Sequence, residues 1–305
     1  MSKIIINGKS DGALKAYKGG DVINAMCAND SVAYRSIETG TPEPPTPARD
    51  YLRLSTIGNN PQLRVNISGG VYDPGLEYST DKQTWTAIPI TSTDSIRISL
   101  PNGVKSVYLR SSQPLAKFEG GGQHTIKPYL STTFSISGHI ASVIDYRQMD
   151  SITAIPNYGL YNVFSGISTL RSASQLSFDG ITTVGEGSCN GMFSYNQNLT
   201  SAPALPMTAL GTYCYANMFL NCPSLATAPE LPATALAINC YQCMFQGCTI
   251  LDEVKISAKV WGLNYAYNWL ENVAASGTIH APTNSLIADY SGGSGVPSGW
   301  TVSYY

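Results

Sequence analysis

Charged side chains are scarce in this chain of 305 residues, at 12% of the sequence. That share is about half of the quarter that is typical of soluble globular proteins. The composition is unlike that of a soluble metabolic enzyme and closer to that of extended, surface-displayed proteins. The 18 Lys and Arg nearly balance the 20 Asp and Glu, and no basic run occurs. The chain therefore lacks the basic stripe that nucleic-acid binding through phosphate neutralisation requires.

Long hydrophobic runs are also missing. The first apolar group is the triplet Ile4, Ile5 and Ile6, which ends at Asn7, whereas a secretory signal needs about 7–15 apolar residues. No segment approaches the roughly 18 apolar residues of a membrane span. We therefore expect no signal peptide, no membrane insertion, and synthesis and folding in a reducing cytoplasm.

Catalytic motifs are equally sparse. The three histidines, His124, His139 and His280, lie far apart, and no GxSxG, HExxH or GxxxxGK[ST] pattern is present. The glycine-rich run 120–124 favours a flexible turn over a phosphate-binding loop, and no calcium-loop pattern occurs. Asp252 and Glu253 are the carboxylate pair that glycoside cleavage could use. We expect neither an enzyme nor a cofactor.

Six of the seven cysteines lie in one segment: Cys189, Cys214, Cys222, Cys240, Cys243 and Cys248. The last three have the spacing of half a zinc site, but no second CxxC or HxxxH half follows. The alternative, which we favour, is that these cysteines are small buried thiols in a repetitive core, because several recur at a fixed interval. No metal site is predicted.

An internal repeat of 26 residues explains that interval. The residues that recur 26 positions apart include the pairs Met192-Phe193, Met218-Phe219 and Met244-Phe245, the leucines Leu199, Leu225 and Leu251, and Cys214 and Cys240. Cys222 and Cys248 occupy the place that Asn196 has in the first copy, and a degenerate copy precedes it around Phe164. A unit of this length cannot bury its apolar face alone, so the repeat predicts a solenoid of stacked coils.

The spacing within one unit predicts a short helix, a turn and a short strand. The helix face would contain Leu210, Tyr213, Cys214, Asn217 and Met218, and the following prolines favour an extended step. We place the repeats at 146–255 and a C-terminal cap at 256–305. The residues expected to cover the last coil are Trp261, Tyr265, Trp269 and Leu270, with Trp300 and Val302 in a closing strand.

Two further segments precede the repeats. Residues 49–145 contain short alternating strands separated by Asn-, Gly- and Asp-rich turns, which predicts an antiparallel β-sandwich. Residues 40–48 contain four prolines and predict a stiff linker. Residues 1–39 predict a small β-meander. Such a short segment rarely folds alone, so it is expected to borrow a core from a partner or from copies of itself.

Tyrosines near the repeat positions are candidate ligand-binding residues. Tyr195, Tyr215 and Tyr241 could form a row on the solenoid surface, where aromatic rings stack on sugars or pack flat against protein. The alternative is that they are core residues of the coils. Both interpretations stay open at this point.

The repeats resemble a known family. The segment CYANMFLNCPSLATAPELPATALAINCYQCMFQGCTIL resembles the leucine-rich repeats of BspA-like bacterial surface antigens, with their F-x-x-C-x-x-L core. LEYSTDKQTWTAI is similar to the immunoglobulin-like module that often precedes such repeats, and NWLENVAASGTI with GVPSGWTV to the cap that follows. The resemblance covers residues 50–305 and implies a multidomain protein with an immunoglobulin-like sandwich, an α/β leucine-rich-repeat solenoid and a cap.

Proteins of this layout occur as exported surface proteins of gut Bacteroidetes and as virion proteins of their phages, including crAss-like phages. The expected absence of a signal peptide favours the virion: a head fibre, capsid decoration or tail fibre, assembled in the host cytoplasm. The N-terminal segment resembles phage docking segments, which implies capsid or tail proteins as partners and a homo-oligomer such as a trimer. The docking residues would be Ile4, Ile5, Ile6, Tyr17, Val22 and Val32.

The repeats would then be displayed outward, where they could bind host or mucosal glycans. A bacterial surface adhesin or glycan-binding protein is the alternative. A third hypothesis is a glycan-cleaving enzyme, whose activity would be lost on replacing Asp252 or Glu253; we expect no such activity.

Overall fold

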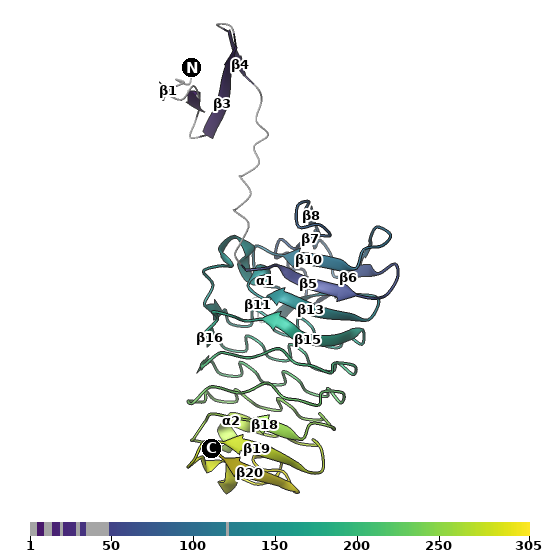
Figure 1. Ribbon diagram of the computed structural model, residues 1–305, viewed down its shortest axis with the longest axis vertical. Coiled ribbons are helices and arrows are strands. Elements are labelled where there is room, and N and C mark those ends of the chain that lie inside the picture. The colour runs from purple at the N-terminus through teal and green to yellow at the C-terminus, as the bar shows by residue number, and fades with distance from the viewer. Residues whose placement is uncertain (1–4, 9–13, 19–20, 29–30, 35–48, 120–121) are drawn as a thin grey trace. The chain divides into compact units, whose positions relative to one another are not determined.

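The chain divides into two compact units, Met1–Thr46 and Pro47–Tyr305. The computed structural model describes the backbone of residues 5–8, 14–18, 21–28, 31–34, 49–119 and 122–305, with side chains from residue 49 onward (Figure 1). The division falls within the segment 40–48 that the sequence marks as a linker. Sandwich, repeats and cap, expected as separate domains, all lie in the second unit.

The first unit contains one antiparallel sheet in meander order. Its strands are β1 (Ile5–Gly8), β2 (Leu14–Lys18), β3 (Asp21–Ala28) and β4 (Ser31–Tyr34). Each strand pairs with the next along the chain, which agrees with the predicted β-meander.

The second unit begins with two mostly antiparallel sheets. The first has the order β15-β13-β5-β10-β7-β8 and the second β11-β12-β6-β9. The strands are β5 (Leu52–Thr56), β6 (Gln62–Ser68), β7 (Glu77–Ser79), β8 (Thr86–Ala87), β9 (Ile96–Ser99), β10 (Ser106–Arg110), β11 (Ala116–Glu119), β12 (Gly122–Leu130), β13 (Phe134–His139) and β15 (Leu170–Ser177). In β5 and β6, alternate residues are buried because successive side chains point to opposite faces.

Strand β13 joins the antiparallel strands to the coils. One edge of β13 pairs antiparallel with β5, and the other pairs parallel with β15. Between them, the chain passes through helix α1 (Ser142–Asp145), the 3-10 helix η1 (Tyr146–Gln148) and β14 (Ala154–Ile155). The switch from antiparallel to parallel pairing lets each later turn of the chain stack on the one before it.

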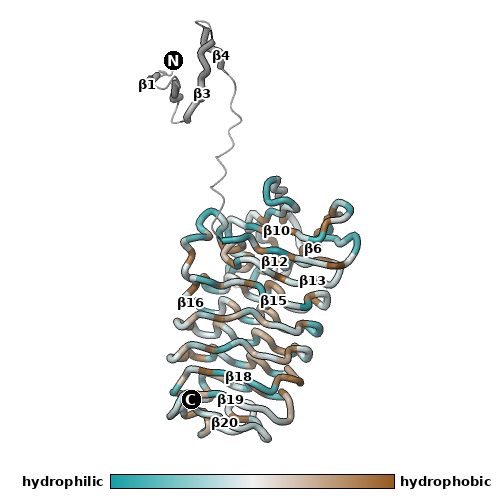
Figure 2. Tube along the Cα trace, in the orientation of Figure 1, coloured by the Kyte–Doolittle hydropathy of each residue, from teal (hydrophilic) through white to brown (hydrophobic). Residues whose placement is uncertain are grey.

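The C-terminal part is a β-solenoid-like region of about six turns. Short parallel strands stack along it: β14, β16 (Thr183–Val184) and β17 (Ala209–Leu210) on one side, then β18 (Glu253–Lys255), β19 (Gly277–Ala281) and β20 (Trp300–Tyr304) near the end. Hydrophobic and hydrophilic stretches alternate along each coil from the sandwich to the C-terminus (Figure 2).

The helix predicted in each repeat is wrong. Residues 149–262 contain no helix, and the segment around Cys214 to Met218 is a run of consecutive turns. Met218 donates its N–H to Tyr215 within the coil, at 3.2 Å, whereas the N–H of Phe219 donates to Met244 of the next coil, at 2.9 Å. An α-helix would use every N–H inside the segment; here alternate N–H groups bind the neighbouring coil instead.

Left-handed backbone at every fourth residue accounts for this conformation. One set of equivalent positions is Gly166, Tyr195, Asn221 and Gly247, and another is Tyr158, Gly187, Tyr213 and Asn239, all with φ between 53° and 77°. Only Gly, and to a lesser degree Asn, adopts this region readily. The Gly and Asn residues spaced four apart thus favour turns over the predicted helix.

One continuous core runs from the two N-terminal sheets of the second unit to the C-terminal coil, from Leu52 to Trp300. Its axis is a ladder of stacked rings formed by Phe164, Phe193, Phe219 and Phe245, with centroids 5.6–5.7 Å apart. Beside this ladder, Cys222 Sγ donates to Phe193 O at 3.1 Å, and Cys248 Sγ donates to Phe219 O at 3.2 Å. The recurring cysteines therefore bind carbonyl groups of the preceding coil.

The predicted C-terminal cap both covers and continues the coils. Trp261, Trp269 and Leu270 are buried, and the Trp269 ring contacts Phe245 at 6.5 Å. Strand β20 extends the parallel pairing of β18 and β19. The remaining elements are α2 (Leu263–Ala266) and the 3-10 helices η2 (Leu286–Asp289) and η3 (Gly292–Ser294).

Candidate functional site

Two of the three candidate tyrosines lie in the core. Tyr215 and Tyr241 are 2% and 1% exposed, and their rings stack at 6.4 Å. Burial raises the pKa of both phenols well above the usual value. A surface ligand cannot stack on either ring, so the row of surface tyrosines predicted from the sequence is corrected at these two positions. Tyr195 differs, because it is 53% exposed.

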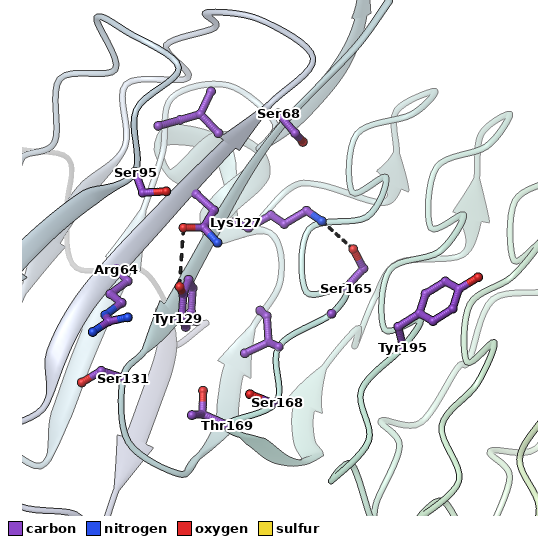
Figure 3. Close-up of a pocket in the computed structure, with 14 residues that line it drawn as sticks. Arg64, Ser68, Ser95, Lys127, Tyr129, Ser131, Ser165, Ser168, Thr169 and Tyr195 are labelled. Carbon is purple, nitrogen blue, oxygen red and sulfur yellow. Dashed lines mark hydrogen bonds between the residues drawn. The ribbon is translucent and has the colours of Figure 1, made fainter.

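Tyr195 borders a cleft of about 820 Å³ between the first coils and the sheet of β11, β12, β6 and β9 (Figure 3). The residues that line this cleft are mostly polar: Arg64, Asn66, Ile67, Ser68, Ser95, Lys127, Tyr129, Ser131, Ser165, Gly166, Ile167, Ser168, Thr169 and Tyr195. None of them is acidic. The cleft is the candidate functional site.

The first wall is the outward face of strands β6 and β12. Leu63 and Val65 of β6 are buried, so the intervening Arg64 and Asn66 project from the other face. The register places Tyr129 opposite Arg64 and Lys127 opposite Asn66. Cross-strand pairing thus brings two cations, an amide and a phenol together on one face.

The second wall is the loop 165–169 of the first coil, with Tyr195 of the next coil at its rim. Lys127 Nζ donates to Ser165 Oγ at 2.6 Å and so bridges the two walls (Figure 3). Thr169 Oγ1 donates to Leu130 O at 2.8 Å, which fixes the loop against the end of β12. At the base of this wall, Asn196 Oδ1 accepts the N–H of Ile167 at 2.7 Å.

The electrostatics of the cleft are those of two unneutralised cations. Within the described part of the chain, neither Arg64 nor Lys127 forms an ion pair. Arg64 Nη2 donates to Gln62 Oε1 at 3.3 Å, while its buried Nε has no hydrogen-bond partner. Burial lowers the pKa of Lys127 because the charged ammonium loses hydration. An anion bound in the cleft would supply the ion pair that both cations lack.

The other candidate groups lie outside this cleft. His280 Nε2 lies 3.1 Å from Glu253 Oε1, beside Asp252 on a shallow surface pocket. Cys240 and Cys248 are buried free thiols, and burial raises the pKa of Cys240 to about 12. Among residues 49–119 and 122–305, no group of three or more His, Cys, Asp or Glu is arranged to hold a metal ion, and the helices there are too short or too polar to cross a membrane.

His139 is held as a neutral ring between backbone groups. Its Nδ1 accepts the N–H of Ala141 at 3.1 Å, so Nε2 carries the proton and donates it to Asp179 O at 2.8 Å. The side chain is 3% exposed, and burial lowers its pKa below 6.5. Protonation would replace the acceptor at Nδ1 with a donor that faces the Ala141 N–H.

We therefore expect acidification to lower the stability of the protein, because folding disfavours protonation of His139. The unfolded state takes up the proton first, near pH 6.5, so this contribution is complete above that pH and is lost as the pH falls through the lower pKa of the folded state. His139→Gln should reduce the slope of unfolding free energy against pH between 7 and 5 by up to about 1.4 kcal/mol per pH unit. Urea denaturation at each pH measures the free energy of unfolding. Equal slopes in the wild type and the variant would contradict a neutral His139 in the folded state.

The predicted docking residues lie in the first unit. Ile5 and Ile6 are in β1, Tyr17 in β2, Val22 in β3 and Val32 in β4, whereas Ile4 is outside the described residues. The register places Ile5, Tyr17 and Val22 in one cross-strand row of the sheet. Strand pairing thus brings together three positions that the sequence separates.

Comparisons with protein-family profiles, curated proteins and solved structures found no match to this chain.

Proposed function

We propose that the chain is a non-enzymatic structural protein displayed on a bacteriophage particle, as a head fibre, capsid decoration or tail fibre. In this proposal, the first unit docks on a capsid or tail protein and the second presents the cleft to saccharides of the host or its mucosal surroundings. The protein would assemble in the host cytoplasm as a homo-oligomer such as a trimer.

The observation that carries the recognition role is the cleft itself. It combines cationic, hydroxyl and aromatic side chains with no acidic group among its lining residues, a set that suits binding of a polar ligand. Its walls come from the sandwich and from two coils, which share one hydrophobic core. A continuous core keeps such walls in place without help from a partner.

The docking role is supported by the small size of the first unit. Four short strands within 46 residues form a single sheet, and domains of this size bury too little apolar surface to be stable without further support. A partner surface, or the equivalent sheets of other copies, would supply the missing core.

Purified particles test the display role. We expect mass spectrometry to detect the full chain in particles, and a variant with Val22→Asp and Val32→Asp to be absent from them while its second unit stays folded. Lys259→Asp is a matched control, because it also adds acidic charge but lies at an exposed position of the second unit; it should be incorporated. A chain found in host membranes and absent from particles would instead support the surface adhesin.

A further inference from the structure

We propose that the cleft binds an anionic saccharide, through a carboxylate or sulfate group that contacts Arg64 and Lys127. This inference rests on the proposed recognition role and adds the chemical class of the ligand. It is carried by three features of the cleft: its unpaired cations, its hydroxyl groups and the conformation of Tyr195.

The two cations lie on the same wall of the cleft. Arg64 and Lys127 are diagonal neighbours on paired strands, since Arg64 lies opposite Tyr129, two residues beyond Lys127. Diagonal neighbours lie about 7–8 Å apart at the backbone, within reach of their long side chains. Arg97 of β9 pairs with Arg64 from the other side. Three cations thus share one face of the sheet.

The hydroxyl groups favour a saccharide over a nucleotide or free phosphate. Five serines and one threonine line the cleft, together with the Asn66 amide and two tyrosines. Sugars present many hydroxyl groups that donate and accept, and an aromatic ring can contact their apolar faces. Arg and Lys also bind phosphate, but the backbone N–H cradle at a helix N-terminus that many phosphate sites use does not occur among the lining residues.

Tyr195 adopts a conformation that its side chain disfavours. Its φ is 60°, whereas the equivalent positions of other coils hold Gly166, Asn221 and Gly247. No hydrogen bond or ring contact within the described residues holds the Tyr195 side chain, unlike Tyr158, whose hydroxyl donates to Glu186 at 2.8 Å. Tyr158 and Tyr213 have the same left-handed backbone but do not line the cleft. Tyr195 is set apart because its exposed ring stands at the cleft without a partner in the described part of the chain. We infer that the Tyr195 ring is kept for contact with the ligand.

The test uses the purified full chain, adenosine monophosphate as a phosphate-bearing control, and three related saccharide probes. These are 3′-sialyllactose, which carries a carboxylate, 3′-sulfolactose, which carries a sulfate, and neutral lactose. We expect calorimetry or ligand-observed NMR to show at least about 10-fold tighter binding of one anionic probe than of lactose. The two anionic arms distinguish the acidic groups, and added salt should weaken the preferred probe.

Charge-removing variants test the cationic contacts. Arg64→Gln and Lys127→Gln should each weaken the preferred probe about 10-fold, with little change for lactose. Lys259→Gln is the matched control, because this exposed lysine lies outside the cleft, and it should bind like the wild type.

Tyr195→Asn provides the sharpest readout, because it places the residue of the next coil at the same left-handed position. It should raise Tm by roughly 2–4 °C and weaken binding. Tyr213→Asn is the matched control: Tyr213 is also left-handed, with φ 55°, and partly exposed, but does not line the cleft. It should raise Tm similarly and leave binding unchanged.

Equal binding of lactose and both anionic probes, no binding of any probe, tighter binding of adenosine monophosphate, or unchanged affinity in both charge variants would overturn the inference. These results leave the display role intact, since that role is judged by the presence of the chain in purified particles. Conversely, selective binding by a chain that is missing from particles would uphold the ligand class and refute the phage assignment.

Discussion

Replacing Phe219 with alanine is expected to lower the free energy of unfolding by about 3–5 kcal/mol. The Phe219 side chain is fully buried, and its ring lies between those of Phe193 and Phe245 at 5.7 and 5.6 Å, tilted by only 4° and 2°. Removal of this ring leaves a cavity that both neighbours border. The turns around it cannot close the gap, because alternate N–H groups fix them to the adjacent coil.

Phe118→Ala is the matched control for this substitution. Phe118 is 54% exposed and has one ring contact, with Tyr158 at 5.3 Å, so its loss should cost about 1 kcal/mol or less. Urea denaturation followed by far-ultraviolet circular dichroism measures both variants. Equal costs at the two positions would show that the stacked phenylalanines do not support the solenoid.

The part of the fold that follows from local periodicity could be predicted from the sequence. The 26-residue repeat identifies Phe193, Phe219 and Phe245 as equivalent, and the structure stacks them. It also equates Asn196 with Cys222, and each donates a hydrogen bond to the phenylalanine carbonyl of the preceding coil, Phe164 O and Phe193 O respectively. Such equivalences need no knowledge of the backbone, because every repeat must present the same groups to its neighbours.

The conformation of each unit could not be predicted from that periodicity. The apolar spacing around Cys214 and Met218 fits a helix as well as it fits consecutive turns. The decisive signal is the spacing of four between Asn217 and Asn221, and between Cys243 and Gly247, which adopt left-handed backbone. Residue type alone is a weak indicator of left-handed backbone here, since Cys243 also adopts it.

The cleft could not be predicted from the sequence for a related reason. Arg64 and Lys127 are far apart in sequence, and only the register of β6 against β12 makes them neighbours. Their wall becomes a cleft because the coil residues 165–169 pack beside it. Tyr215 shows the reverse difficulty: its hydroxyl is buried without a hydrogen-bond partner, whereas buried phenols usually have one. Residue chemistry left both the surface and the core open for Tyr215, and packing places it in the core.

Replacing Asn196 with alanine is the second large effect that we expect, a loss of about 2–6 kcal/mol. The buried amide donates to Phe164 O at 2.7 Å and to Phe193 O at 3.0 Å, and its Oδ1 accepts the Ile167 N–H at 2.7 Å. Phe193 O keeps a donor in Cys222 Sγ. The other two backbone groups lose this partner, at about 1–3 kcal/mol each.

Asn196→Cys separates these two losses. A thiol at this position can donate to Phe164 O, as Cys222 does to Phe193 O, but it supplies no comparable acceptor for Ile167 N–H. We therefore expect a smaller loss of stability than with alanine, together with faster hydrogen exchange at the Ile167 amide in both variants. Because Ile167 lines the cleft, both variants should also weaken binding there. Equal unfolding free energies for the two variants would contradict a donating role for the amide, and unchanged exchange at Ile167 would contradict its accepting role.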